Sequence, residues 1–350
     1  MSRLLLFNPE NDLALASNAL SYTPTAAAIA MRQSGALLPL WWSEAGDEVI
    51  VPEALMPVAK AMCMKWNLPG KAVTRTTAST AMPWGWSRSA LRELRSLGVS
   101  TLPSDERVRA IRNLSHRRTS IELLKAIGTE EQLLPMEFSH ADTAIEAIHT
   151  MGETVLKMPW SGSGRGVFHS NHISRIMLEK TVRDVIHSQG SIIVEHELDK
   201  KRDFAALFYS NGERVTYRGL SLFITDTHGH YQGNLLMPQP QLMEKLGVEI
   251  TELANKVAEK LTPIVAPTYS GWLGVDMMIY SDENGNTTIW PCVEINLRMT
   301  MGVLALYLCE RIAHAGEKAR LIVSKKLPKG EVVNLSPTGG KIYYTVQKGD

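Results

Sequence analysis

The chain has 350 residues, which is long enough for two or three domains with a large hydrophobic core. Hydrophobic residues make up 44% and charged residues 21%, as is ordinary for a soluble globular protein. The net charge of +1 gives no indication of a nucleic-acid or membrane surface, so neither partner is expected. The cysteines are too widely spaced for a metal cluster or a disulfide framework, and a cytoplasmic location is therefore expected: Cys63, Cys292 and Cys309.

The first part of the chain predicts a small α/β domain with a parallel sheet, because a strand, a helix and a second strand follow one another. These elements are Leu4–Phe7, Pro24–Met31 and Ala36–Trp42. The first strand turns polar at Asn8, too soon for a signal peptide, and no apolar stretch reaches membrane-spanning length. The polar loop Asn8–Asp12 would lie at the carboxyl end of this strand, where α/β folds place ligands, although a simple turn with a helix cap is the favoured interpretation.

The next elements are read from periodicity, glycines and turn signals. Residues 73–90 look like a loop, and a connection near residues 102–105 suggests a domain boundary. The expected helices are Ser87–Leu97, Ser115–Ile127, Thr143–His149, Ser174–Ser188, Gln241–Leu261 and Met301–Ile312. The expected strands are 154–159, 166–169, Ser191–Val194, Phe204–Tyr209, Val215–Ile224, Gly274–Tyr280 and Ile289–Val293, followed by a C-terminal hairpin.

A glycine-rich loop follows an apolar strand that contains Lys157. Glycine allows the backbone to approach a ligand closely, and successive N–H groups in such a loop can bind an anion. The loop fits neither a dinucleotide fingerprint, because a strand follows it, nor a Walker loop. It is interpreted as a phosphate-binding loop, with a plain glycine-rich hairpin as the alternative: Ser161, Gly162, Ser163, Gly164, Arg165 and Gly166.

The helix that starts near Ser115 carries three cations, His116, Arg117 and Arg118. Cations at a helix N-terminus oppose the macrodipole and are tolerated best beside an anion. A solvated basic face is the alternative.

Two consecutive strands near the C-terminus carry acidic side chains. Asp276 interrupts the first, and Glu294, Asn296 and Arg298 alternate along the end of the second, so these three side chains face the same side. A buried carboxylate is costly unless it is paired or bound to a cation, and oxygen ligands of this kind suit Mg²⁺. The alternative is an acidic pair salt-bridged to Arg298. Two histidines, His228 and His230, could bind zinc, but no ligand cluster is near them in sequence.

Taken in order, these features resemble the ATP-grasp superfamily, from about Pro103 to Gly302. Lys157 to Gly166 looks like the lysine and glycine-rich lid, Glu195-His-Glu-Leu198 like the adenine-binding linker, and Gly274-Val-Asp276 with Glu294 to Arg298 like the magnesium-binding strands. The resemblance implies two α+β subdomains that grip ATP, preceded by an N-terminal α/β domain. The division follows as residues 1–104, then 105–325 with a lid at about 130–195, then a tail over 326–350.

The resemblance also implies roles for single residues. Arg117 would reach the phosphates, Lys157 the α-phosphate and adenine, and the glycine loop the β- and γ-phosphates. Glu195 and the backbone of His196 and Leu198 would bind adenine, and Asp203 would lie near the ribose or the lid. The metal would be held by Asp276, Glu294 and Asn296. Arg298 would stabilise the transferring phosphoryl group. His116 stands where the superfamily commonly has aspartate, and Leu297 where it usually has proline.

The implied activity is an ADP-forming ligase that uses ATP and Mg²⁺, with Mn²⁺ as an alternative metal. A small-molecule carboxylate would form an acyl phosphate, which an amine or thiol would then attack. The N-terminal domain would help to form the acceptor site, with Arg218 and the loop from His228 to Asn234 as candidate substrate contacts. A small-molecule kinase and a non-catalytic nucleotide-binding protein are the alternatives, and a homodimer is compatible with the superfamily.

Overall fold

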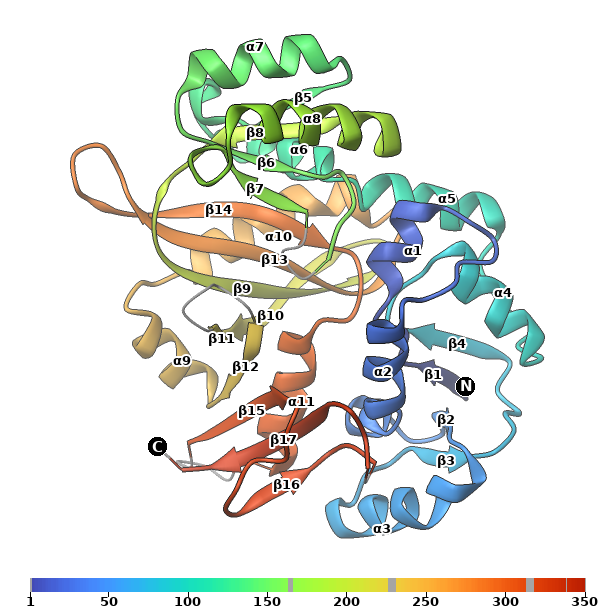
Figure 1. Cartoon of the computed structure of the whole chain (residues 1–350). Helices are drawn as coiled ribbons and strands as arrows, with labels where there is room; N and C mark the ends of the chain where they lie inside the picture. Colours follow the sequence, from blue (N-terminus) through green and yellow to red (C-terminus); the bar gives the residue numbers. More distant parts are fainter. Residues whose placement is uncertain (1, 163–165, 226–230, 313–317, 338, 350) are drawn as a thin grey trace.

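The computed structural model describes residues 2–162, 166–225, 231–312, 318–337 and 339–349. Its N-terminal sheet is parallel, with the strand order β3-β2-β1-β4, and lies at one end of the molecule (Figure 1). The strands are β1 (Arg3–Leu6), β2 (Glu48–Ile50), β3 (Lys71–Val73) and β4 (Thr80–Pro83). The helices of this part are α1 (Asn11–Ser17), α2 (Ala26–Ser34), α3 (Met56–Trp66), α4 (Arg88–Ser96) and α5 (Asp105–Leu114). The expected N-terminal α/β arrangement is confirmed.

Two expectations for this part were wrong. The apolar segment Ala36–Trp42 is not a strand but contains a 3-10 helix over Leu38–Trp42, in which every residue is buried. A run that is apolar on all sides cannot distinguish a strand from a buried helix, and Pro39 favours the helical turn. The segment 73–90 is not all loop, because it contains β4, an edge strand that tolerates Pro83.

The central sheet is antiparallel, with the order β10-β9-β13-β14. It consists of β9 (Asp199–Asn211), β10 (Val215–Ser221), β13 (Ser270–Ser281) and β14 (Thr287–Asn296). Side chains alternate along β9: Phe204, Ala206 and Phe208 face one hydrophobic core. Ala205 and Leu207 face another. Burial on both faces explains why residues 204–209 of this strand form a continuous apolar run, whereas its first five residues are charged.

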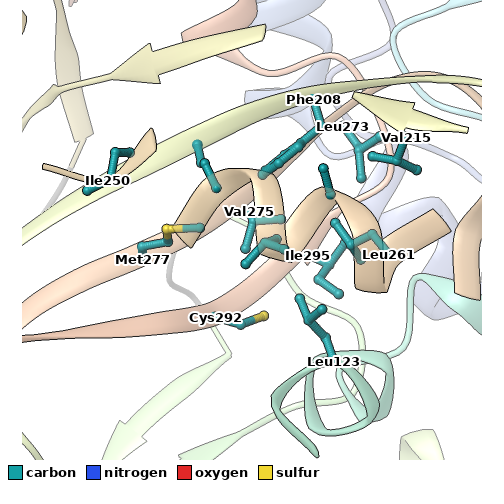
Figure 2. Close-up of a cluster of buried hydrophobic side chains, with 14 of the residues drawn as sticks. Leu123, Phe208, Val215, Ile250, Leu261, Leu273, Val275, Met277, Cys292 and Ile295 are labelled. Carbon is teal, nitrogen blue, oxygen red and sulfur yellow. The ribbon is translucent and has the colours of Figure 1, made fainter. Parts of the chain in front are cut away.

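The first of these cores lies between the central sheet and the helices α6 (Arg118–Ala126) and α10 (Thr251–Val265), as Figure 2 shows. On the opposite face, α11 (Met301–Ile312) packs in a core that also contains residues of the N-terminal sheet. The expected long helix Gln241–Leu261 was wrong, because α9 (Gln239–Leu246) and α10 are separate. Gly247 ends α9 with a φ of +79°, a left-handed conformation that glycine adopts without strain.

A third sheet forms the region predicted as the lid. Its order is β5-β8-β6-β7, with β5 (Met136–Phe138), β6 (Thr154–Lys157), β7 (Val167–His169) and β8 (Ile192–His196). The helices α7 (Ala141–Met151) and α8 (Arg175–Gln189) bury their apolar faces against this sheet. The strand expected over Phe204–Tyr209 is longer than predicted, because β9 begins at Asp199 and ends at Asn211.

The fourth sheet, β11-β12-β15-β17-β16, joins the middle of the chain to its end. It contains β11 (Phe223–Thr225), β12 (Tyr231–Leu236), β15 (Ala319–Ser324), β16 (Val332–Asn334) and β17 (Tyr343–Lys348). The antiparallel pairing of β16 with β17 is the expected hairpin. Three further 3-10 turns occur at Glu53–Leu55, Glu131–Leu133 and Ser170–His172. Over the described ranges, no helix combines the length and the apolar character needed to cross a bilayer.

Candidate nucleotide and metal site

The acidic residues of the two neighbouring strands lie together as the sequence predicts. Asp276 on β13 pairs in register with Glu294 on β14. The Nδ2 atom of Asn296 donates a hydrogen bond to Oδ2 of Asp276 over 3.1 Å. Burial, together with the negative charge of Glu294, raises the pKa of the Asp276 carboxyl to about 7. Loss of solvent and a like charge both disfavour the ionised carboxylate, and the charge of Arg298 offsets them only in part.

Arg298 forms its salt bridge with Asp12, and not with the acidic pair that the sequence placed beside it. Its Nε atom donates to Oδ1 of Asp12 over 2.8 Å, and its Nη2 atom to Oδ2 over 2.8 Å, which is a bidentate pair. Nη2 also donates to Oδ1 of Asn296 over 2.9 Å. A chain of hydrogen bonds therefore runs from α1 through Arg298 and Asn296 to Asp276.

Arg117 connects the acidic strand to the glycine loop. It is buried at the start of α6, and its Nη2 atom lies 3.1 Å from Oε2 of Glu294 and 3.0 Å from Oγ of Ser161. Its Nε atom donates to the carbonyl oxygen of Met158 over 2.9 Å. The cation at the helix start thus faces an anion inside the protein, which is the condition under which such a charge is tolerated.

The two neighbouring cations have other surroundings. His116 is buried, and its ring packs edge-on against Trp160 with the centroids 4.6 Å apart. Burial, and then the positive charge of Arg118, lower the pKa of His116 to about 4. The side chain of Arg118 is about half exposed and pairs with Glu137 over 2.6 Å. The predicted cationic cluster therefore contributes only Arg117 directly to the site.

Lys157 is buried at the end of β6 and forms an ion pair with Glu195 on β8. Its Nζ atom also lies 3.4 Å from the carbonyl oxygen of Val293 on β14, so it links the lid sheet to the central sheet. His196 follows Glu195 and pairs in register with Thr154. Leu198 packs against the core of the central sheet. Asp203 lies on β9, opposite Met278, and accepts a hydrogen bond from Lys200 over 2.8 Å.

Only the two ends of the glycine loop can be described, because Ser163, Gly164 and Arg165 lie outside the described residues. The loop closes where the N–H of Met158 donates to the carbonyl oxygen of Gly166 over 2.8 Å. A Cβ added to Gly166 would lie 2.5 Å from Cβ of Ser161, and one added to Gly162 would lie 2.8 Å from Oδ2 of Asp12. A side chain at either position would force a neighbouring side chain to move, so close contacts within the protein favour glycine at both.

An open pocket with about 310 Å³ of empty space lies where these elements meet. Of the residues predicted for the site, Ser161, Glu294, Asn296 and Arg298 line it. Two other lining residues, Asn11 and Asp12, belong to the loop Asn8–Asp12, which the sequence analysis weighed as a ligand position but interpreted as a turn with a helix cap. It assigned no site role to the remaining lining residues, namely Leu15, Ser115, Trp160, Ile295 and Leu297. For Asp12 the available signal was its loop at the carboxyl end of the first parallel strand.

Trp160 fixes one wall of this pocket. Its backbone N–H donates to Oε1 of Gln189 over 2.9 Å, and its indole Nε1 donates to the carbonyl oxygen of Arg112 over 2.9 Å. The guanidinium carbon of Arg112 lies 3.6 Å from the centroid of the indole ring. The start of the glycine loop is therefore held by α5 and α8.

The residues around Asp276 suit a magnesium ion only when other ligands complete it. In the described part of the chain, no group of three histidine, cysteine, aspartate or glutamate residues is arranged to hold a metal. The site offers two carboxylates and the amide oxygen of Asn296, and Mg²⁺ is commonly held by one or two carboxylates together with substrate phosphates. This donor set therefore fits Mg²⁺ bound together with a nucleotide.

Arg218, a further expected contact, lies away from the pocket. The guanidinium carbon of Arg218 lies 5.8 Å from the ring centroid of Tyr209, and Arg218 is not among the residues that line the pocket. His228 and His230 lie outside the described residues, so the zinc site considered for them in the sequence analysis stays a prediction.

No family model and no curated protein sequence matches the chain. Solved structures do. Phosphoribosylamine–glycine ligase from Thermotoga maritima matches with a TM-score of 0.58 at 12% identity, over 100% of this chain and 93% of that one. N5-carboxyaminoimidazole synthetase from Staphylococcus aureus, complexed with ADP, matches with a TM-score of 0.55 at 14% identity, over 100% of this chain and 93% of that one. A biotin carboxylase from Campylobacter jejuni matches with a TM-score of 0.55 at 13% identity, over 99% of this chain and 87% of that one.

These similarities extend over the whole chain and define the class: the protein has the ATP-grasp fold. The fold resemblance read from the sequence is therefore confirmed. At this level of identity the comparisons establish the fold, and the particular reaction has to be argued from the site.

Proposed function

We propose that the protein is an ATP- and magnesium-dependent, ADP-forming ligase that joins a small-molecule carboxylate to an amine or a thiol. The observation that carries the proposal is the position of Arg117, which contacts both Ser161 of the glycine loop and Glu294 of the acidic strand. The glycine loop and the acidic strand are thereby brought to one cation, as a site that holds phosphate and metal together would require. The solved relatives named as a ligase and a synthetase, one of them complexed with ADP, support this assignment.

ATP would lie between the lid sheet and the central sheet. Lys157, paired with Glu195, would contact the α-phosphate and adenine, while the backbone of His196 and Leu198 would read the adenine edge. Arg117 and the glycine loop would hold the β- and γ-phosphates. Asp203 would stand near the ribose or the lid.

Asp276, Glu294 and Asn296 would hold Mg²⁺, or Mn²⁺ in its place. The metal would supply charge neutralisation for the phosphates. Arg298 would stabilise the transferring phosphoryl group and the acyl phosphate, since its guanidinium lies at the pocket wall. In such a reaction the protein contributes positioning and charge, and no protein nucleophile is required.

The acid and the acceptor would enter the pocket from the side of α1, where Asn11, Asp12 and Leu15 line it. We expect these small molecules to be the only partners of the site. A cytoplasmic enzyme fits the three free cysteines, and a homodimer is compatible with the fold.

Thermal unfolding with Mg-ATP, Mg-ADP and Mg-GTP tests the nucleotide site. A nucleotide at about 100 times its Kd stabilises the folded state by about 2.7 kcal/mol, which corresponds to about 3 to 4 °C for a chain of this length. We expect such a shift with Mg-ATP or Mg-ADP in the wild type and its loss in Glu294→Ala. Glu283→Ala, on the exposed turn that precedes β14, is the matched control and should respond like the wild type.

Release of ADP is then screened with acids and amines or thiols in pairs. ADP that forms only when both substrates are present supports the ligase, whereas a stable phosphorylated acid without an acceptor would identify a kinase. If no nucleotide shifts the wild-type transition, the nucleotide site is refuted, and a binding role on the same fold becomes the better interpretation.

A further inference from the structure

The salt bridge between Asp12 and Arg298 joins residues 286 positions apart in the sequence. Both side chains are largely buried, with exposed fractions of 19% and 17%. The N-terminal residues around Asp12 are held to the same strand end by further bonds. The amide of Asn8 pairs with the backbone of Gly85, Gly85 forms a bridge with Arg298, and the N–H of Met299 donates to the carbonyl oxygen of Trp84 over 2.8 Å. Asp12 is therefore fixed relative to Arg298 by the backbone as well as by its side chain.

Almost every N–H group of Arg298 has a partner. A guanidinium has five N–H donors. Nε and one Nη2 donor are taken by Asp12, the other Nη2 donor by Asn296, and one Nη1 donor by the carbonyl oxygen of Met299 over 3.1 Å. Among the described residues this leaves one Nη1 donor for a ligand. The orientation of the guanidinium plane is thus set chiefly by the bidentate contact with Asp12.

Without Asp12, other carboxylates would compete for Arg298. Asn296 bonds to Arg298 on one side and to Asp276 on the other, so a single side chain separates the guanidinium from Asp276. Glu294 and Asp276 both interact electrostatically with Arg298 in the present arrangement. A guanidinium released from Asp12 would pair with one of these acids, and that acid would then be less available to a metal.

We propose that Asp12 is a positioning residue, which holds Arg298 at the pocket wall and keeps its charge away from the carboxylates that bind the metal. This inference rests on the proposed function. The glycine loop also lies close to Asp12, since a Cβ added to Gly162 would lie 2.8 Å from Oδ2 of Asp12. Asp12 therefore pairs with the arginine and lies close to the first glycine of the loop.

The test uses Asp12→Asn, which keeps the shape of the side chain and removes its charge. Stabilisation of the full-length protein by ADP is measured by thermal unfolding as Mg²⁺ is titrated, so no substrate has to be known. We expect the Mg²⁺ midpoint of Asp12→Asn to be about ten-fold higher than that of the wild type, because a charge-assisted bond from Arg298 competes for the metal ligands. Asp142→Asn, which breaks the exposed pair with Arg183, should leave the midpoint unchanged.

The double variant Asp12→Asn/Arg298→Ala separates positioning from a general structural role. If Asp12 acts through Arg298, its loss has no further effect on the Mg²⁺ midpoint once Arg298 is absent. The inference is overturned, while the proposed function stands, in either of two cases. In the first, the Mg²⁺ midpoint of Asp12→Asn equals that of the wild type. In the second, Asp12→Asn raises the midpoint equally in the wild type and in Arg298→Ala. A wild type that shows no magnesium-dependent stabilisation by ADP overturns both.

Discussion

Replacement of Asp276 by asparagine should remove a pH dependence of stability that the folded protein has when no metal is bound. The pKa of Asp276 is raised from 3.8 to about 7. A raised pKa means that the folded state binds the proton more tightly than the unfolded state. The resulting stabilisation is complete below pH 3.8 and is lost as the pH rises through about 7.

The magnitude follows from the two pKa values. The whole shift corresponds to at most about 4 kcal/mol, and about 2.5 kcal/mol of it is lost between pH 5 and pH 8. Asparagine keeps an oxygen that can accept the hydrogen bond from Asn296 and does not titrate. Relative to the wild type, Asp276→Asn should therefore become more stable by about 2.5 kcal/mol when the pH is raised from 5 to 8.

The assay is urea unfolding of both proteins at pH 5 and pH 8 in the presence of a chelator. The difference between wild type and variant isolates Asp276 from the other titrating groups, and Asp142→Asn on the surface serves as the control. A difference in free energy of unfolding that is the same at both pH values would refute the reasoning. Added Mg²⁺ with ADP should favour the wild type at pH 8, because the metal would supply a positive charge beside the ionised carboxylate of Asp276.

Two further predictions concern buried charges. Lys157→Met leaves the carboxylate of Glu195 without its partner, so we expect the free energy of unfolding in urea to fall by about 3 to 5 kcal/mol. The double variant Lys157→Met/Glu195→Gln should regain most of this stability. Equal losses in the single and double variants would contradict the prediction. His116, with a pKa lowered to about 4, contributes stability above pH 6.5 that is lost as the pH falls towards 4, at most about 3 kcal/mol. Unfolding of the wild type and His116→Gln across that range measures this contribution, and parallel pH profiles would count against it.

Much of the fold could be predicted because local signals agreed with the tertiary structure. The helix Met301–Ile312 has the expected bounds, and the turn after β13 joins the two acidic strands as expected. The failures occurred where local signals are ambiguous. The segment Leu38–Trp42 is buried on all sides, so its periodicity carries no information, and the break at Gly247 lies inside an otherwise continuous helical pattern.

In the candidate site, too, some features could be predicted from the sequence and others could not. The sequence alone determined that Asp276, Glu294 and Asn296 lie together, because strand alternation and a short turn leave few other arrangements. It also placed Lys157 inside a buried strand, where a charge requires a partner. Which partner each charge has was decided only by the tertiary structure. Arg298 pairs with Asp12, and Arg117 with Glu294, because the ends of separate sheets and helices meet at one pocket, and no local pattern in the sequence encodes that meeting.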